Sequence, residues 1–399
     1  MRNIWLLSLL LLFCCLGLNG EERQFHPLHR NQSYQTFKNI SLPVDANIVN
    51  TIFQDDSGMI WLGTMRGLYS YNGYDLHEYV DETYLADVPV YVTDDENSTV
   101  TDLCLGTDNG VRWFNLDRKT FGCPYEQAEL TLAVRSLSLF DGCLWIGTRD
   151  HGLKKMSLVS GEMESVDLKN ETETTIYSLE ATEDRLYVAS YEHLSYYDCS
   201  DKVRKTIDLG SPERLMVNSL LWDRKRDCIW AGTEGHLYRY DIKTGKVHRQ
   251  SILTGNSFKT LTLDHDGNLL IGTDAGLFVF DFDSKTHTRI VHDSRNPRSL
   301  CNNIIWDILC DRNNNVWLAT GRGVSLAQRN VGQHYIYLSE IVRSGDGNLF
   351  TYMLMDSHGD YWLGGENGLI HIDGTAPYEA EWFRQDSDRY PLRHNHIRC

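Results

Sequence analysis

The residues in this chain whose types and spacing could do chemistry include, first, a short run of oxygen ligands. Asp264, Asp266 and Asn268 lie at alternate positions, as in the first half of a calcium-binding loop. Ala275, however, stands where such a loop has its closing glutamate. The run is therefore interpreted as a turn, and no metal site is predicted.

Aspartates at one recurring position could act as catalytic carboxylates if the fold brought them together. Asp55, Asp311 and Asp356 each follow a predicted strand and precede a glycine or an asparagine by three residues, which is the composition of a tight turn. Because each lies in a separate copy of one repeat, we expect them to cap separate turns spread around the fold, with Asp55 at the surface. The sequence also lacks the HExxH, GxSxG and GxxxxGK[ST] motifs. No enzyme and no cofactor are predicted.

Histidines and cysteines give weaker signals. His151, His193 and His236 fall in equivalent turns of successive repeats. They are interpreted either as a set that contacts a ligand or as residues of solvated turns. The ten cysteines include no CxxC pair, so a zinc site is excluded, and we expect no essential disulfide. Three cysteines on predicted strands are expected to be small buried residues: Cys104, Cys143 and Cys228.

An internal repeat organises most of the chain. The string DDSGMIWLGTMRGLY, which begins at Asp55, recurs from Asp264, Asp311 and Asp356, and looser copies lie between them. Alignment on the small residue of the second strand gives eight copies spaced by 40 to 47 residues: Gly63, Gly106, Gly147, Ala189, Gly232, Gly272, Ala319 and Gly364.

Each copy predicts four antiparallel strands. In the first copy, strands at 49–54 and 59–64 flank the aspartate turn, and a Thr-x-x-Gly turn leads to strands at 67–71 and 76–80. Trp61 is an expected core anchor, and the glycine that follows it leaves room for a neighbouring sheet. A small sheet that is apolar on both faces cannot stand alone in water. The fold class is therefore an all-β β-propeller of four-stranded antiparallel blades.

Seven blades are predicted, with an eighth repeat that begins a second propeller. We expect the segment 34–40 to supply the fourth strand of the seventh blade and so to close the ring. The predicted divisions are an N-terminal linker at 21–33, the seven-bladed propeller at 34–338 and an incomplete second propeller at 339–399.

The first 20 residues predict a signal peptide. An apolar run from Ile4 to Leu18 follows Arg2, and it is short for a membrane span. The whole chain has 38 basic and 55 acidic residues, a net charge of −17. This charge opposes binding to nucleic acid or to anionic membranes. An exported protein is expected, without nucleic acid partners and without membrane contact beyond the signal peptide.

The string DDSGMIWLGTMRGLYSYNGY, preceded by FKNISLPVDANIVNTIFQ, resembles the regulator-propeller repeats in the periplasmic sensor half of hybrid two-component systems from gut Bacteroidetes. The resemblance covers roughly residues 34–399. It implies a periplasmic sensor propeller of a receptor that controls polysaccharide utilisation, with an oligosaccharide as ligand. It also implies that any histidine kinase activity lies in other domains, and it leaves open a dimer of the full-length receptor.

Two features qualify this resemblance. The final residues, 386–397, have the form of the segment that leads into the seventh unit, so the chain is interpreted as a truncated receptor. Two other classes of function stay open, namely an exported propeller enzyme that acts on glycans and a scaffold for protein interaction.

The turns between the second and third strands are the predicted ligand site. Their residues differ among the copies, whereas the aspartate turns at the other end of each sheet hardly vary. Cationic, aromatic and hydrogen-bonding side chains suit sugar hydroxyls and rings. The predicted contacts to a neutral or acidic oligosaccharide are Arg66, Arg149, His151, Tyr191 and Arg322. The alternative is that these turns are simply solvated loops.

Overall fold

The structure is a computed structural model that describes most of the chain after its first 33 residues. The described residues are 34, 36–79, 90–92, 102–122, 132–168, 174–191, 193–198, 203–210, 215–250, 255–328, 349–373, 380–387 and 390–397. The predicted signal peptide and linker and the predicted boundary at 338 lie outside them. The chain divides into two units, residues 1–330 and 331–399. No helix in the described part has the length and apolar character needed to cross a membrane.

The described residues of the first unit form seven four-stranded sheets, each antiparallel throughout. The first three sheets are β2 (Val49–Gln54), β3 (Ile60–Thr64), β4 (Gly67–Tyr71) and β5 (Leu76–Tyr79); β6 (Val90–Val92), β7 (Asp102–Thr107), β8 (Gly110–Asn115) and β9 (Thr120–Phe121); β10 (Val134–Phe140), β11 (Cys143–Thr148), β12 (Leu153–Ser157) and β13 (Met163–Ser165). The next three are β14 (Ile176–Ala181), β15 (Arg185–Ser190), β16 (Leu194–Asp198) and β17 (Arg204–Ile207); β18 (Val217–Asp223), β19 (Cys228–Thr233), β20 (Leu237–Asp241) and β21 (Val247–Gln250); β22 (Phe258–Leu263), β23 (Leu269–Thr273), β24 (Gly276–Asp281) and β25 (Thr286–Ile290). The seventh sheet combines β26 (Ile305–Cys310), β27 (Val316–Thr320) and β28 (Gly323–Ala327) with β1 (Lys38–Ile40), and a 3-10 turn, η2 (Val44–Ala46), precedes β2.

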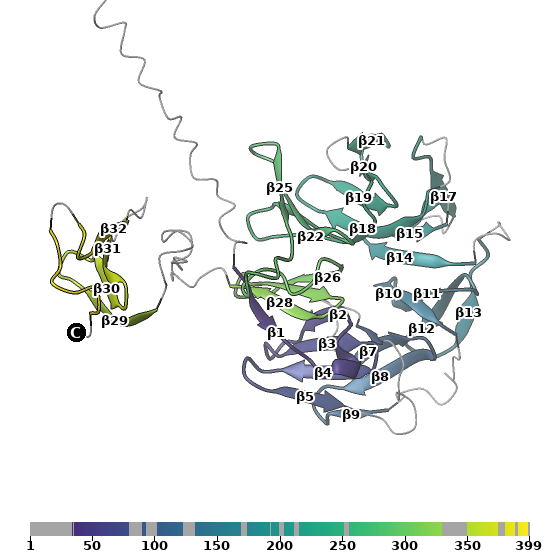
Figure 1. The fold of residues 1–399 in the computed structure, drawn as a ribbon. Helices are drawn as coiled ribbons and strands as arrows, with labels where there is room; N and C mark the ends of the chain where they lie inside the picture. Colours follow the sequence, from purple (N-terminus) through teal and green to yellow (C-terminus); the bar gives the residue numbers. More distant parts are fainter. Residues whose placement is uncertain are drawn as a thin grey trace, which may run out of the picture. The chain divides into compact units, whose positions relative to one another are not determined.

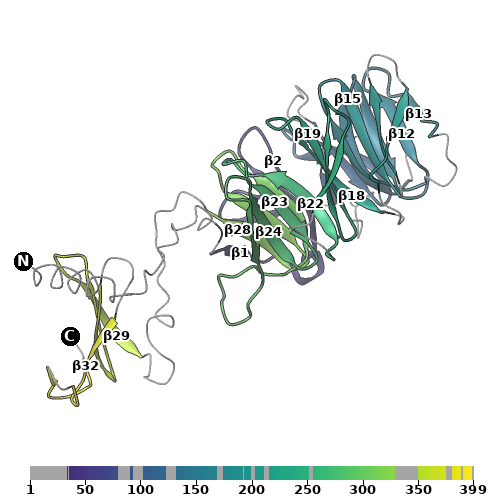
Figure 2. The ribbon, with the colours of Figure 1, turned by 90° about the horizontal axis from the view of Figure 1, so that it is seen from above.

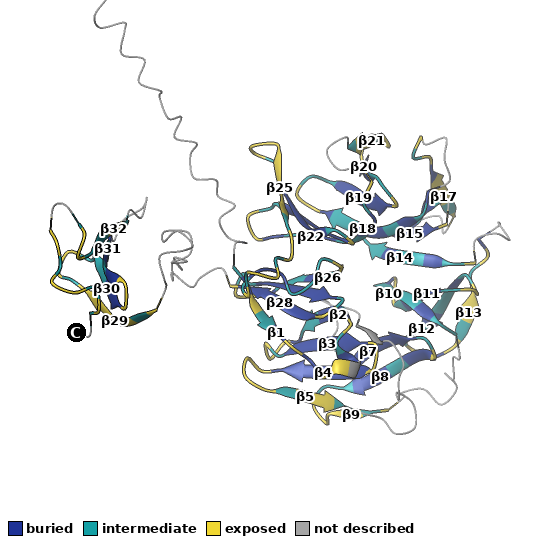
Figure 3. Cartoon of the chain, in the orientation of Figure 1, coloured by how far each residue is buried: buried dark blue, intermediate teal, exposed yellow. Residues whose placement is uncertain are grey.

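The sheets are arranged around a ring, with the first strand of each sheet innermost (Figure 1). Neighbouring sheets contact one another through these first strands, and β26 contacts β2, which joins the seventh sheet to the first. Adjacent sheets also pack face to face: β23 and β24 lie beside β28 (Figure 2), and buried residues of all three strands belong to one core cluster. Buried residues concentrate on the middle strands, whereas outer strands such as β25 are exposed (Figure 3). The predicted β-propeller is confirmed.

The N-terminal strand closes the ring. β1 pairs with β28 in the register Lys38↔Leu326, and Asn39 donates to the carbonyl of Ser299 over 2.9 Å. The hydroxyl of Tyr34, which is 3% exposed, donates to Asp264 of the sixth sheet over 2.7 Å. The prediction that the segment 34–40 pairs into the seventh blade is therefore confirmed, and the edge of β28 is covered.

Asp55 and Asp311 are turn residues of the first hairpins, but they do not face solvent. Asp55 is 4% exposed; its Oδ1 accepts from the backbone N–H of Ser57 and Met59, and its Oδ2 accepts from Trp61 Nε1 over 2.8 Å. Asp311 makes the same bond to Trp317 over 2.8 Å. The expectation that Asp55 lies at the surface was wrong, because its carboxylate also accepts from the indole N–H of the buried Trp61.

The glycine of the second strand leaves room for a neighbouring sheet, as predicted. A Cβ at Gly147 would lie 2.3 Å from Ser136 Oγ on β10 and 2.8 Å from Ile176 Cγ2 on β14. The third and fourth sheets thus approach each other at a distance that only glycine permits at this position.

The described residues of the second unit form one sheet, with β29 (Phe350–Met355), β30 (Tyr361–Gly365), β31 (Gly368–Ile372) and β32 (Ala380–Phe383). Its small core includes Leu363, Ile370 and Ile372. Met353 on β29 is 67% exposed, whereas its equivalent in the first sheet, Ile52, is 5% exposed. Within the ring, this surface of a first strand is covered by the neighbouring sheet.

Candidate functional site

The five predicted ligand residues lie in turns between second and third strands. Arg66 belongs to the first sheet, Arg149 and His151 to the third, Tyr191 to the fourth and Arg322 to the seventh. Because all sheets share one strand order, these turns lie on one face of the ring. Four of the side chains are exposed, and Arg149 is half-buried. They come from separate parts of this face, and their contact with a ligand stays a prediction.

Arg149 has a partner within the protein. Its guanidinium lies 3.4 Å from a carboxylate oxygen of Asp108, in the equivalent turn of the second sheet. The backbone carbonyl of Arg149 also accepts from the hydroxyl of Thr175. Arg149 therefore links neighbouring turns, and its charge is partly compensated by Asp108.

A threonine, or in the fourth sheet Ser190, fixes each of these turns from within. Thr64 Oγ1 accepts from the backbone N–H of Arg66 and Gly67, at 3.1 Å each, and donates to the carbonyl of Gly67 over 2.9 Å. The turn of the seventh sheet has the same geometry. Thr320 Oγ1 accepts from the N–H of Arg322 and donates to the carbonyl of Gly323. The φ angle of Gly323 is 87°, as the predicted tight turn requires.

The turns are also bonded to the segment that enters the next sheet. The N–H of Gly152 donates to the carbonyl of Thr174 over 2.7 Å, that of Gly276 to Asn303 over 2.8 Å, and that of Gly323 to Asn47 over 2.6 Å. Each donor belongs to one sheet and each acceptor precedes the first strand of the next. The turn backbones on this face are therefore fixed in place without a ligand, as in a preformed binding surface.

Sequence reasoning missed a second set of residues on the same face. Six first strands of the described part of the ring shift register between their first and third residues, so the second residue forms a β-bulge. These bulged residues, which we call the bulge ring, are Asn50, Arg135, Tyr177, Asn218, Lys259 and Trp306. A bulged residue leaves the ladder, and its side chain is re-aimed.

The bulge ring lies next to the predicted turns. The residue that precedes each bulge pairs with the threonine or serine of its turn, as in Val49↔Thr64 and Ile176↔Ser190. Asn218 Nδ2 donates to Glu234 Oε1, in the turn of the fifth sheet, over 2.8 Å. The sequence contained a signal for the bulge ring. When the repeats are aligned, the second residue of the first strand is an amide, a cation or an aromatic residue. It follows an apolar residue and usually precedes a serine or threonine.

Carboxylates on the first strands are bonded to backbone N–H groups of neighbouring sheets. Glu180 Oε1, in the fourth sheet, accepts from Trp222 N of the fifth over 2.9 Å. Asp307 Oδ2, in the seventh, accepts from Ile52 N of the first over 3.0 Å. Burial raises the pKa of Asp307, and its hydrogen bonds oppose this shift. Both carboxylates hold sheets together.

Two of the described cysteines, Cys228 and Cys310, are poorly suited to nucleophilic or metal chemistry. Burial raises the pKa of Cys228 to about 11 and that of Cys310 to about 12, so both are protonated thiols near neutral pH. Cys104, Cys143 and Cys228 are free cysteines, of which Cys104 and Cys228 are buried as predicted and Cys143 is half-buried. The ring of His236 contacts the guanidinium of Arg249 at 3.0 Å.

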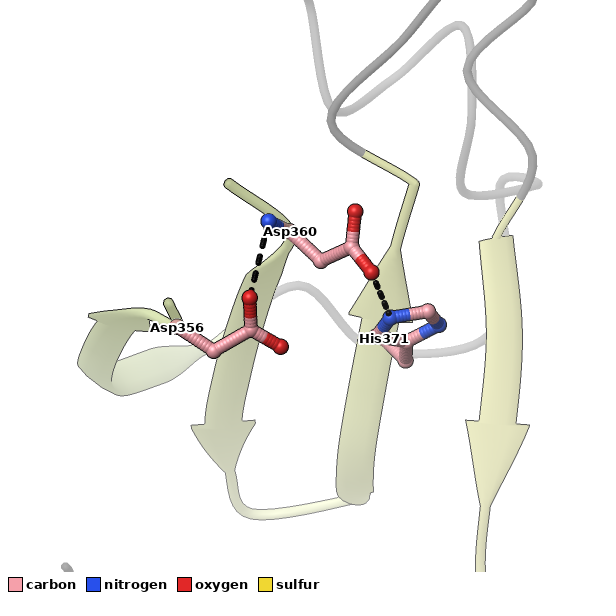
Figure 4. A group of neighbouring side chains, drawn as sticks. All are labelled: Asp356, Asp360 and His371. Carbon is pink, nitrogen blue, oxygen red and sulfur yellow. Dashed lines mark hydrogen bonds and ion pairs between the residues drawn. The ribbon is translucent and has the colours of Figure 1, made fainter. Parts of the chain in front are cut away.

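One group in the second unit has the spacing of metal ligands. Ligand atoms of Asp356, Asp360 and His371 lie within 4.8 Å of one another (Figure 4). Asp356, however, accepts from the N–H of Asp360 over 3.1 Å and from Trp362 Nε1 over 3.0 Å, as Asp55 does in its own turn. Asp360 is bonded to His371 over 3.1 Å. Asp356 therefore has the role of a turn residue, and the group carries no metal proposal.

Two segments of the chain match a known protein family, and the chain as a whole is similar to solved structures. Residues 43–66 and 299–322 match the two component regulator propeller family. The chain is similar to the extracellular domain of BT4673 from B. thetaiotaomicron, described as a one component system in one crystal structure and a hybrid two component system in another. The sequence identities are 39% and 38%, and in both cases the match covers 92% of this chain and 50% of that chain with a TM-score of 0.69. No curated protein matches the chain.

More distant similarities show the fold alone. The extracellular domain of the hybrid two component system BT3049 from B. thetaiotaomicron is 19% identical, with 90% of this chain and 50% of that chain covered and a TM-score of 0.66. A streptogramin B lyase is 13% identical, with 74% of this chain and 98% of that chain covered and a TM-score of 0.60. The chain thus spans half the length of the BT4673 and BT3049 domains.

Proposed function

We propose, on the premise that this chain belongs to the two-component regulator propellers, that it is the ligand-sensing part of a signalling receptor that acts in the periplasm. The ligands are glycan fragments, and the response is the control of polysaccharide utilisation. The observation that carries the proposal is the similarity to an extracellular domain of a signalling system, at 39% identity over 92% of this chain.

The face of the ring that carries the turns between second and third strands, which we call the turn face, has a geometry that supports binding rather than catalysis. Its turns are fixed by threonine or serine side chains and by backbone bonds to the next sheet, so a ligand would not have to order them. The carboxylates of Glu180 and Asp307, which lie on first strands, accept backbone N–H groups. A carboxylate in such a bond is held as an acceptor and is poorly placed for acid–base work on a sugar.

The test is calorimetry of the purified chain with oligosaccharides of different backbones, followed by chromatography of the recovered sugars. We expect one class of oligosaccharide to bind with its chain length unchanged after overnight incubation. Shortened products would contradict the proposal and show an enzyme. Capture of a protein partner with no carbohydrate binding would show a scaffold instead.

A control separates specific binding from adsorption to an acidic protein. The substitution Lys243→Gln removes an exposed cation from the turn between β20 and β21, at the opposite end of the fifth sheet. Its affinity for the bound oligosaccharide should equal that of the unmodified chain.

A further inference from the structure

We propose that the bulge ring binds an acidic sugar, with Lys259 and Arg135 holding its anionic groups and Trp306 supporting its ring. This inference rests on the proposed function, because it names the place and the chemical class of the ligand. The anionic group is a carboxylate, as in a uronic acid, or a sulfate ester. Both present oxygen acceptors to a cation.

The bulges make these side chains available. Each ring residue follows a fully buried residue, such as Val134, Phe258 or Ile305, yet it is itself half-buried or exposed. A regular strand would place it opposite a residue of the second strand, whereas the bulge leaves it unpaired in the ladder. The same device recurs in sheet after sheet, so side chains of several sheets are presented around the axis at one depth.

Lys259 and Trp306 form a composite surface across two sheets. The ammonium of Lys259, on β22, lies 5.4 Å from the ring centroid of Trp306, on β26, and Trp306 is 37% exposed. An exposed indole offers an apolar face to the C–H groups of a sugar, and the adjacent ammonium offers a charged donor to a substituent on that sugar. This pair is suited to a sugar ring that carries an acid group.

The charge of the bulge ring differs from that of the whole protein. The chain has a net charge of −17, yet the ring contains two cations and no carboxylate. Lys259 and Arg135 have no ion pair among the described residues, and Arg135 Nε is buried there without a hydrogen-bond partner. The carboxylate of Glu234, which accepts from Asn218 of the ring over 2.8 Å, also accepts from the hydroxyl of Ser257 over 2.7 Å.

The two cations lie on well-separated sheets. Arg135 is on the third sheet and Lys259 on the sixth, three positions away in a ring of seven. A ligand that contacts both has to span the distance between these two sheets, and the shorter way around the ring passes Tyr177 of the fourth sheet and Asn218 of the fifth. We therefore expect a short oligosaccharide with more than one acid group to bind more tightly than a single acidic sugar.

The experiment is calorimetry of the whole chain with three disaccharides: one of two uronic acids, one carrying two sulfates and one neutral. We expect at least one acidic disaccharide to bind about tenfold more tightly than the neutral one, as one charge-assisted hydrogen bond allows. Lys259→Gln and Arg135→Gln should each weaken that binding about tenfold. Trp306→Ala should weaken the binding of any sugar that does bind. Preference for uronate or for sulfate identifies the anionic group.

The controls separate this inference from the proposed function. Lys243→Gln removes the same charge at the opposite end of a sheet and should leave affinity unchanged. Tight binding of the neutral disaccharide, or unchanged affinity in Lys259→Gln and Trp306→Ala, would overturn the inference and leave the sensor function standing. If no carbohydrate binds, both are overturned. Melting temperatures of the variants identify any that fail to fold, and Lys259→Gln, at a half-buried flexible side chain, decides the question if Arg135→Gln does fail.

Discussion

The carboxylate of Asp307 accepts a hydrogen bond of 2.8 Å from the hydroxyl of Thr51, and these two residues belong to the seventh and the first sheet. Asp307 also accepts from Ile52 N over 3.0 Å, and the hydroxyl of Thr260, in the sixth sheet, lies 3.4 Å away. The equivalent residue of most other sheets is a serine or threonine. The carboxylate of Asp307, which reaches further than a serine or threonine hydroxyl, therefore connects the sixth, seventh and first sheets where the ring closes.

Asp307→Ala should destabilise the protein by about 1–3 kcal/mol, because Ile52 N would lose its acceptor at a buried site. Urea denaturation followed by tryptophan fluorescence measures this difference. Asp75→Ala, at an exposed turn, is the matched control and should change stability by less than about 0.5 kcal/mol. Equal effects of the two substitutions would show that Asp307 does not hold the closure.

The pH dependence of stability should report the same residue. Burial raises the pKa of Asp307, so the folded chain binds this proton more tightly than the unfolded chain does. The contribution of Asp307 to the free energy of unfolding is complete below the pKa of the unfolded chain, about 3.9. It is lost as pH rises through the raised pKa of the folded chain. Relative to Asp307→Asn, the unmodified chain should therefore lose stability across that range. A difference that stays constant from about pH 4 to 7, the span between the ordinary carboxyl pKa and neutrality, would be inconsistent with a raised pKa.

Replacing the aspartate of a first hairpin should lower the free energy of unfolding more than replacing a residue of a surface turn. Asp55→Ala leaves the indole N–H of the buried Trp61 and two backbone N–H groups without their acceptor, so we expect a loss of about 2–3 kcal/mol. Trp230→Ala should cost about 3–5 kcal/mol through lost packing. Chemical denaturation compares the two, and an Asp55→Ala loss below about 0.5 kcal/mol, the usual limit for surface changes, would mean that the turn bonds are unimportant.

Gly147→Ala should destabilise the contact between the third and fourth sheets. The added methyl would meet Ser136 and Ile176 at 2.3 and 2.8 Å, and overpacking of this kind costs about 1–3 kcal/mol. Gly122→Ala is the control, because its Cβ would meet nothing within 4 Å. Melting temperatures that fall equally in both variants would show that close packing is not the reason for glycine at position 147.

Much of the fold could be predicted because its determinants are local and repeated. The Asp-x-x-Gly and Thr-x-x-Gly turns set the ends of β2, β3 and β4, and eight copies made the strand order plain. The pairing of β1 with β28 could be predicted because a ring of such sheets leaves one strand missing. The burial of Asp55 could not, because it depends on where the indole of Trp61 turns within the packed sheet.

The candidate site was predicted less well for a related reason. Variation among the turns led to Arg66, Arg149, His151, Tyr191 and Arg322, but variation does not show which side chains already have partners within the protein. Arg149 lies beside Asp108, which no local pattern indicates. The bulges at Lys259 and Trp306 depend on the register between two strands, and register appears only when the strands are paired. An alignment of the repeats does indicate these residues, because charged and aromatic side chains recur at the second position of the first strand.

The most direct test of the central claim is hydrogen–deuterium exchange of the whole chain with and without a bound acidic oligosaccharide. Binding at the turn face predicts slower exchange in the turns after β11, β15 and β27 and at the starts of β22 and β26. The aspartate turns at 55–58 and 311–314, at the other end of the sheets, should exchange at unchanged rates. Protection of the aspartate turns, with no change at the turn face, would contradict the account.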